Sequence, residues 1–222
     1  MMFKEKFNAR VLEMGVKAFS ILGYKTSRSR EYYFAMSNIP SNNCRILDIG
    51  SVGSLFPLKL AKNGNHVYVV DVRKYHERHP NLISFVSDIT NTSFSNEFFD
   101  IITCISTIEH IGLSAYGDPK HEKGDKLTIN ECKRILKKGG KLILTTPFTG
   151  EYNVAPFKNT YERVYNYETI NDLFIGWNLL KEEYYIPKNS KNWIKVTREE
   201  AEKKYEVYPK SNLSCFLLEK CD

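Results

Sequence analysis

The amino-acid sequence predicts an α/β fold in which a mostly parallel β-sheet carries helices on both faces. Three observations predict it: apolar strand-like runs alternate with helical segments, glycines follow the first run, and two further apolar runs close the chain. Apolar strands that alternate with helices are typical of parallel sheets, because crossover helices pack on both faces. The length of 222 residues, with 42% hydrophobic residues, suffices for one large domain with a buried core.

The strongest local signal is the segment 45–54, which reads RILDIGSVGS. Its β-forming half leads into Gly50 and Gly53, an amphipathic segment follows, and the next apolar run ends at Asp71. A glycine turn lets the backbone approach a ligand, and the free N–H groups that begin a helix attract anions. A carboxylate at the end of the second strand can accept both ribose hydroxyls. The unit therefore predicts a site for an adenosine-containing cofactor.

The remaining elements continue the alternation of strands and helices. The expected strands are 45–49, 66–71, 83–86, 99–106, 141–146, 178–185 and 213–219. The expected helices are 3–22, 29–36, 55–62, 125–136, 167–174 and 197–204. A capping-box pattern, Thr-Arg-Glu-Glu, begins the last helix. The two closing strands, with an insertion between them, predict an antiparallel edge on the parallel sheet.

Composition and charge exclude several classes of protein. The net charge is +6, from 32 Lys and Arg against 26 Asp and Glu, and the lysines are scattered, which favours a solvated surface over a nucleic-acid groove. No run of eighteen apolar residues occurs, and residues 1–10 lack the apolar core of a signal peptide. Five cysteines without CxxC spacing indicate reduced thiols. We therefore expect a cytoplasmic protein with no membrane span.

Five motifs occur in a specific order along the chain. They are ILDIG at 46–50, Asp71, Ser87-Asp88, FDIITCISTIEHI at 99–111 and LKKGGKLILTTP at 136–147. Together they resemble the class I S-adenosylmethionine-dependent methyltransferases, strongly over residues 44–150 and loosely elsewhere. The resemblance implies a Rossmann-like, seven-stranded, mostly parallel sheet with an antiparallel last hairpin. It also implies S-adenosyl-L-methionine (SAM) as the cofactor.

The same resemblance assigns contacts with SAM to individual residues. The methionine end would lie against the glycine turn and the acid before it, and the sulfonium near the end of the fourth strand. The ribose would bind the acid that ends the second strand, and the adenine would lie against the residues that follow the second and third strands. In chain order these residues are Asp48, Gly50, Ser51, Gly53, Asp71, Val72, Asp88, Ile89 and Ser106. The turn departs from the family, because Val52 and Ser54 stand where relatives usually carry glycine.

The pair Glu109-His110 ends the fourth strand, where an acceptor would meet the cofactor. An imidazole with a pKa near neutrality is a credible general base. In related enzymes that carry this pair, however, the Glu can orient its surroundings and the His can pack against the cofactor, so both roles stay open. Tyr116 and Asp118 follow in a polar loop and can contact a hydroxylated acceptor, or belong to a plain surface loop. The spacing of His110, Asp118 and His121 matches no strong metal-binding pattern, and no metal is expected.

The chain is expected to be a single domain over 1–222, with three parts. Residues 1–43 form a helical cap in which an arginine can meet the cofactor carboxylate, residues 44–150 form the cofactor core, and residues 151–222 hold the acceptor-side segment and the closing strands. Aromatic residues suited to a sugar face, a flat ring or plain packing follow the fifth strand: Tyr152, Phe157, Tyr161 and Tyr165.

The leading hypothesis is SAM-dependent methyl transfer to a small polar acceptor such as a sugar or glycan precursor. The string from Glu109 to Pro119 resembles methyltransferase-like proteins of which some are tied to sugar or surface-polysaccharide modification. An RNA or protein methyltransferase is an alternative that rests on the modest positive charge. The irregular glycine turn allows a non-catalytic SAM-binding protein. A dehydrogenase is disfavoured, because the third fingerprint glycine is missing.

Overall fold

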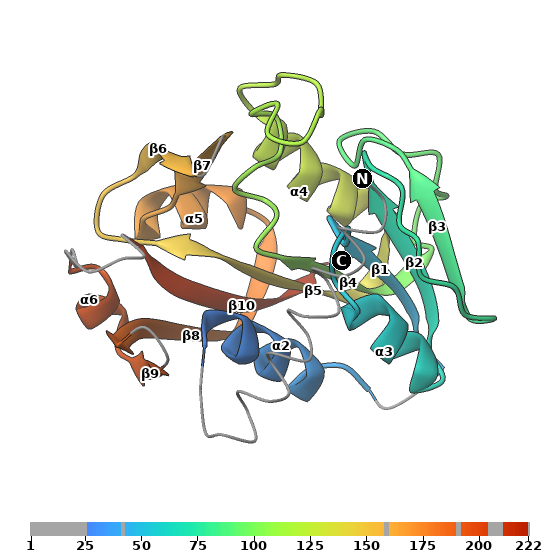
Figure 1. Cartoon of the computed structure of the whole chain (residues 1–222), viewed down its shortest axis with the longest axis horizontal. Helices are drawn as coiled ribbons and strands as arrows, with labels where there is room; N and C mark the ends of the chain where they lie inside the picture. The colour runs from blue at the N-terminus through green and yellow to red at the C-terminus, as the bar shows by residue number, and fades with distance from the viewer. Residues whose placement is uncertain (1–25, 41–42, 158–159, 190–191, 204–210, 222) are drawn as a thin grey trace.

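A computed structural model describes residues 26–40, 43–157, 160–189, 192–203 and 211–221. The helix expected at 3–22 lies outside these ranges. An eight-stranded mixed sheet runs through the described part of the chain in the order β3-β2-β1-β4-β5-β10-β8-β9. Helices α2 and α3 lie on one face of this sheet, and α4 and α5 lie on the other (Figure 1). The predicted α/β class is confirmed.

The first five strands are parallel and form the half of the sheet that the glycine motif predicts. The chain leaves β1 outward to β2 and β3, then returns to β4 on the other side of β1, so the strand order reverses beside β1. In open parallel sheets, ligands bind in the crevice at this reversal, outside the carboxyl ends of the strands. The elements of this half are β1 (Arg45–Ile49), α3 (Phe56–Lys62), β2 (His66–Asp71), β3 (Leu82–Val86), β4 (Phe99–Ile105), α4 (Gly124–Ile135) and β5 (Leu136–Phe148).

The antiparallel edge is also confirmed. Strand β10 (Asn212–Lys220) lies between β5 and β8 (Trp177–Asn189) and is antiparallel to both. An additional edge strand, β9 (Asn192–Val196), pairs antiparallel with the end of β8 and extends the sheet beyond the seven strands expected. The helix expected at 197–204 is shorter: α6 (Arg198–Ala201) has the predicted capping box, in which the Thr197 hydroxyl accepts from the backbone N–H of Glu200.

A two-stranded hairpin, which the sequence analysis did not anticipate, occupies the segment after β5. It consists of β6 (Asn153–Phe157) and β7 (Thr160–Val164), and α5 (Tyr167–Leu173) follows with a capping box between Asn166 and Thr169. The N-terminal segment contributes α2 (Ser27–Ser37), which replaces the expected helix 29–36 with nearly the same bounds. None of the helices in the described ranges is long and apolar enough to cross a membrane.

Two apolar cores, one on each face, hold the sheet between its helices. One core joins the sheet to α4 and α5 and includes the buried thiols of Cys104 and Cys132. The other joins it to α2 and α3 and includes Cys215. Because both faces are covered, the strand ends are where polar groups of the sheet can meet a ligand.

Candidate active site

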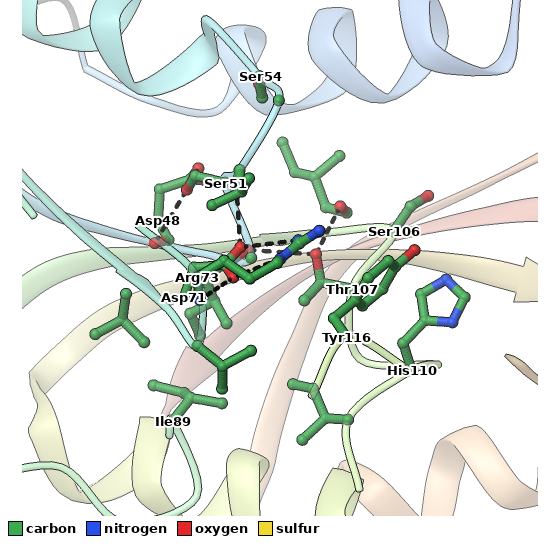
Figure 2. A pocket seen from close by; sticks show the side chains of 18 of the residues that line it. Asp48, Ser51, Ser54, Asp71, Arg73, Ile89, Ser106, Thr107, His110 and Tyr116 are labelled. Carbon is green, nitrogen blue, oxygen red and sulfur yellow. Dashed lines mark hydrogen bonds and ion pairs between the residues drawn. The ribbon is translucent and has the colours of Figure 1, made fainter. Parts of the chain in front are cut away.

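A cavity of about 700 Å³ lies at the carboxyl ends of β1, β2 and β4, beneath the start of α2 (Figure 2). Its volume is in the range of small-molecule sites. It gathers every residue that the sequence assigned to the cofactor: Asp48, Gly50, Ser51, Gly53, Asp71, Val72, Asp88, Ile89 and Ser106. His110, Tyr116 and Asp118 line the same cavity, whereas Glu109 does not.

The glycine turn requires its two glycines for different reasons. Gly50 has a φ of +76°, and a Cβ there would lie 2.2 Å from the Thr107 side chain, so both backbone and space demand glycine. Gly53 has a φ of +91°, but a Cβ there would meet nothing within 4 Å. Only the backbone conformation therefore excludes other residues at Gly53. The backbone of the turn can approach a ligand closely.

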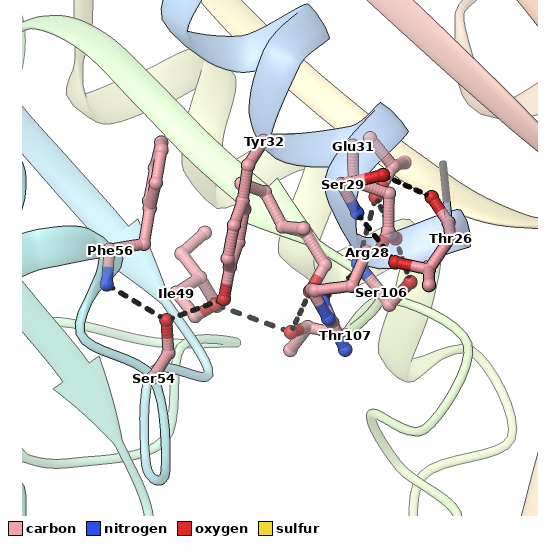
Figure 3. Close-up of polar contacts among 12 residues, drawn as sticks. Thr26, Arg28, Ser29, Glu31, Tyr32, Ile49, Ser54, Phe56, Ser106 and Thr107 are labelled. Atoms are coloured by element: carbon pink, nitrogen blue, oxygen red, sulfur yellow. Dashed lines mark hydrogen bonds and ion pairs between the residues drawn. The ribbon is translucent and has the colours of Figure 1, made fainter. Parts of the chain in front are cut away.

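Ser54, one of the two residues that stand where relatives carry glycine, links the turn to α2. Its hydroxyl lies 2.8 Å from the Tyr32 hydroxyl and accepts a hydrogen bond from the backbone N–H of Phe56 (Figure 3). The Tyr32 ring stacks on Phe56 with centroids 5.0 Å apart. The serine that replaces the family glycine therefore forms a hydrogen bond between the turn and α2.

Asp48 supports the turn from below rather than facing open solvent. The hydroxyls of Ser51 and Thr103 each donate a hydrogen bond to its carboxylate. Burial raises the pKa of Asp48 from its ordinary 3.8 to about 6, although both hydroxyl donors oppose that rise. Asp48 thus fixes Ser51, which lies in the turn, and lines the cavity as a carboxyl group that titrates just below neutral pH.

Asp71 ends β2 and lies in the part of the cavity that the sequence analysis assigned to the cofactor, which is called the cofactor half below. Its carboxylate accepts backbone N–H donors from Val52 at 3.1 Å and from Arg73 at 2.9 Å. The Arg73 guanidinium donates to the same two oxygens at 3.1 and 3.2 Å. On the neighbouring strand end, Asp88 accepts from the backbone N–H of Thr90 at 2.8 Å, and Ile89 offers a buried apolar side chain.

Helix α2 is fastened over the strand ends by a buried carboxylate. Glu31, only 2% exposed, accepts hydrogen bonds from the hydroxyls of Ser106 and Thr145, and its other oxygen pairs with Arg28 at 3.3 Å. Figure 3 shows Arg28 and Glu31 on the side of Ser106 and Thr107, whereas Tyr32 extends from α2 to Ser54. Arg28 and Tyr32 line the cavity, so α2 supplies an arginine there.

His110 is held in one orientation by the hairpin β6-β7. Its Nδ1 lies 2.9 Å from the backbone carbonyl oxygen of Tyr161. Because a carbonyl only accepts, Nδ1 carries a proton, and in the neutral ring the basic lone pair is on Nε2. The Tyr116 ring meets the imidazole edge to face, with centroids 5.3 Å apart (Figure 2).

Glu109 is buried and does not line the cavity. Its Oε2 has no hydrogen-bond partner among the described residues, and burial raises the pKa of this carboxyl well above its ordinary value. Its backbone carbonyl accepts from the N–H of Arg163 in β7. The contact with β7 is therefore made by the backbone of Glu109, and its carboxyl group is not among the groups that line the cavity.

The polar loop after His110 is folded by Asp118 and by a buried arginine. Asp118 accepts from the backbone N–H groups of Gly112 at 2.7 Å and Tyr116 at 3.1 Å. Arg163, 2% exposed, donates to the carbonyl oxygens of Ile111 and Glu122. The role of Arg163 is not visible in the sequence, because its partners lie 52 and 41 positions earlier.

Two further groups near the acceptor side were missed by the sequence analysis. Burial raises the pKa of Glu162 in β7 to about 7, so this carboxyl titrates near neutral pH. Thr107 contacts the turn at Gly50, and its hydroxyl donates to the backbone oxygens of Ile49 and Ile105. Among the residues that the structure describes, no group of three His, Cys, Asp or Glu side chains could hold a metal ion.

Comparison with solved structures defines the class to which this fold belongs. A SAM-dependent methyltransferase from Methanosarcina mazei matches with a TM-score of 0.58 and 14% identity, over 84% of this chain and 96% of that one. The 1,6-didemethyltoxoflavin-N1-methyltransferase of Burkholderia thailandensis, solved with S-adenosylhomocysteine, matches with a TM-score of 0.63 and 10% identity, over 100% of this chain and 90% of that one. The molecule has the fold of the class I SAM-dependent methyltransferases.

Sequence comparison identifies the family of the chain and two curated relatives. Residues 49–220 match the family described as "Caenorhabditis protein of unknown function, DUF268", and the chain belongs to that family. Among curated proteins, the ubiquinone biosynthesis O-methyltransferase of Coxiella burnetii is 32% identical over 110 residues, which are 46% of this chain and 42% of that protein. The protein of the same name from Xylella fastidiosa is 26% identical over 125 residues, or 51% and 46% of the two chains. The matched stretch spans less than half the length of these relatives.

Proposed function

We propose that the chain is a SAM-dependent methyltransferase that acts on the hydroxyl of a small polar acceptor, such as a sugar or glycan precursor. One observation carries the proposal: a single cavity joins the strand-end residues suited to an adenosine cofactor with an oriented imidazole. The curated relatives are named O-methyltransferases, which supports an oxygen acceptor. In this proposal residues 44–150 hold the cofactor, residues 151–222 support the acceptor side, and the N-terminal part covers the site.

The cofactor half offers polar and apolar groups in the order that SAM would need. The backbone of the turn at Gly50 and Gly53, with Arg28 above it, would hold the methionine end. Asp71 would accept the ribose hydroxyls, and Val72, Asp88 and Ile89 would enclose the adenine. When bound, SAM supplies a methyl group on a cationic sulfur. The sheet end at Ser106 would then lie between that group and the acceptor.

On the acceptor side, His110 would take the proton of the attacking hydroxyl. The bond from Nδ1 to the Tyr161 carbonyl fixes the tautomer that leaves the lone pair on Nε2, as a general base requires. Tyr116 and Asp118 would surround the acceptor, and an aromatic ring beside polar groups suits a sugar face. Five free cysteine thiols fit a reducing, cytoplasmic setting.

Calorimetric titration with SAM and with S-adenosylhomocysteine tests the cofactor part of the proposal. We expect binding by the wild-type chain and its loss in Asp71→Ala. Asp100→Ala provides the matched control, because this acid lies at the opposite end of the sheet, pairs with Lys137 and does not line the cavity. Absence of binding to the wild-type chain would falsify the proposal.

Transfer of a labelled methyl group from SAM to a panel of sugars and glycan precursors tests the reaction. Product formation that depends on His110 is the expected result. Cofactor binding with no transfer to any hydroxylated acceptor would favour a non-catalytic SAM-binding protein. Transfer to RNA or protein substrates, with none to small molecules, would move the assignment to the macromolecular alternative.

A further inference from the structure

The Arg73 side chain occupies the polar centre of the cofactor half. Its Nε and Nη2 lie 3.1 and 3.2 Å from the two carboxylate oxygens of Asp71 (Figure 2). The backbone N–H groups of Arg73 and Val52 donate to the same oxygens, one to each. The Asp71 side chain is 3% exposed, so protein donors rather than bulk water form the hydrogen bonds of its carboxylate.

These four donors leave Asp71 no room for another partner. A carboxylate has about four acceptor positions, two on each oxygen. Two are used by backbone N–H groups that are part of the turn and of the strand end. The other two are used by the guanidinium. Ribose hydroxyls can therefore bond to Asp71 only after the guanidinium has left, since the backbone donors are fixed by the fold.

The Arg73 side chain is able to leave without disturbing the fold. It is 38% exposed, and a long side chain with exposed length changes rotamer readily. Its guanidinium carbon already lies 4.2 Å from the centre of the Tyr116 ring, within the range of a cation–π contact. Tyr116 in turn contacts His110. The guanidinium therefore lies between the cofactor half and the part of the cavity around His110 and Tyr116, which is called the acceptor half.

We propose that Arg73 is a displaceable latch whose guanidinium is released from Asp71 by the cofactor and then binds an anionic group of the acceptor. This inference rests on the proposed function. A guanidinium that has lost its carboxylate partner is an uncompensated cation beside Tyr116, and it pairs best with a carboxylate or a phosphate. The acceptor class is therefore a small hydroxylated molecule that carries such a group. The cofactor must bind first, because the cation is neutralised until then.

The first test compares S-adenosylhomocysteine binding by the wild-type chain, Arg73→Gln and Lys74→Gln. Lys74 is the adjacent exposed cation and does not line the cavity, so its variant removes the same charge at the surface. We expect Arg73→Gln to bind about five- to tenfold more tightly, since the competitor for Asp71 is gone, and Lys74→Gln to match the wild type. Equal or weaker binding by Arg73→Gln overturns the latch while leaving the proposed function in place. Absence of binding by all three chains overturns both.

The second test adds inorganic phosphate or acetate to the chain with and without S-adenosylhomocysteine, and measures binding by calorimetry. We expect an anion to bind the loaded wild-type chain and not the unloaded one, and to lose that binding in Arg73→Gln. Preference for phosphate over acetate, or the reverse, identifies the anionic group of the acceptor. Binding that is unchanged by S-adenosylhomocysteine or by the substitution overturns the anion-binding role, as does an absence of binding to the loaded wild-type chain.

Discussion

The cofactor half and the acceptor half of the cavity are held together in different ways. In the cofactor half the turn itself has local hydrogen bonds, since Ser51 and Asp48 are three positions apart and Arg73 and Asp71 are two apart, and distant partners such as Thr103 add to them. In the acceptor half the hydrogen bonds of His110 and Arg163 join distant residues: His110 and Tyr161 are 51 positions apart, and Arg163 and Ile111 are 52 apart. The first half is formed by a turn between two strands, whereas the second depends on a separate hairpin. A change in the hairpin can therefore alter the acceptor side and spare the cofactor side.

The largest effect is expected on the methyl-transfer rate, from a substitution that changes only the acceptor half. His110→Ala should lower the methyl-transfer rate roughly 10²- to 10⁴-fold, the usual contribution of a general base, with S-adenosylhomocysteine affinity unchanged. Rate measurements at saturating cofactor, with calorimetry alongside, check both expectations. His66→Ala is the matched control, because this exposed histidine begins β2 at the opposite end of the strand. An equal loss of cofactor affinity would show that the two halves are not separable at His110.

Substitution of the two glycines of the turn should instead perturb the cofactor half. Gly50→Ala should lower the free energy of unfolding by about 3 kcal/mol or more, because the new methyl group meets Thr107 and the backbone is strained as well. Gly53→Ala adds backbone strain without a collision and should lower it by about 1–2 kcal/mol. Urea unfolding of both variants measures the difference. Equal losses would mean that the Thr107 side chain moves aside freely.

The pH dependence of the unfolding free energy tests the buried carboxyl group of Asp48 in the cofactor half. Its pKa is higher in the folded chain than in the unfolded one, so the unfolded state ionises first and stability falls as pH rises from about 4 to about 6. The total loss is roughly 3 kcal/mol, and it levels off above the folded pKa. Asp48→Asn removes this titration. The unfolding free energy of the wild type relative to the variant should fall across that window, and a constant difference between them would contradict the buried-carboxyl account.

The smallest effect concerns a non-local tie within the cofactor half. Tyr32→Phe should lower the free energy of unfolding by about 1 kcal/mol, since it removes one side of the hydrogen bond between turn and α2. Ser54→Ala should lower it somewhat more, because it also removes the acceptor of the Phe56 backbone N–H. The double variant should lose less than the sum of the two, as expected for residues that share one interaction. Thermal or urea unfolding of the four chains completes the cycle. Strict additivity would indicate that the two hydroxyls act independently.

Prediction from sequence succeeded where the signal is local. The strands from β1 to β5 and the polar residues at their ends follow from alternating apolar runs, glycines and single acids, all of which are read within a few residues. The position of α6 followed from its capping box for the same reason. Ser54 shows the limit of such signals, because its departure from the family glycine became interpretable only once Tyr32 was seen above it.

The missed features fall into two groups. Strand β9 and the hairpin β6-β7 pair with neighbours in the chain, Asn189 with Asn192 and Phe157 with Thr160, but the segments are short and carried no strand signal that the sequence analysis used. The other missed features depend on long-range contacts. The bond from Ser106 to Glu31 joins residues 75 positions apart. Glu109 and His110 are adjacent, and the sequence offers no basis for deciding which of the two faces the cavity. Arg73 is a different case: it lies close to its partner in the chain, but no family pattern marks it.

The two apolar cores on opposite faces of the sheet each contain at least one buried cysteine, whose reactivity can report local opening of the core around it. Cys104 and Cys132 lie in the core against α4 and α5, and Cys215 lies in the core against α2 and α3. Burial raises the pKa of all three thiols, so they resist alkylation until the surrounding layer opens. The alkylation rate at each cysteine therefore measures how often its own layer separates from the sheet. Mass spectrometry of a single labelled sample can rank the two layers without any engineered probe.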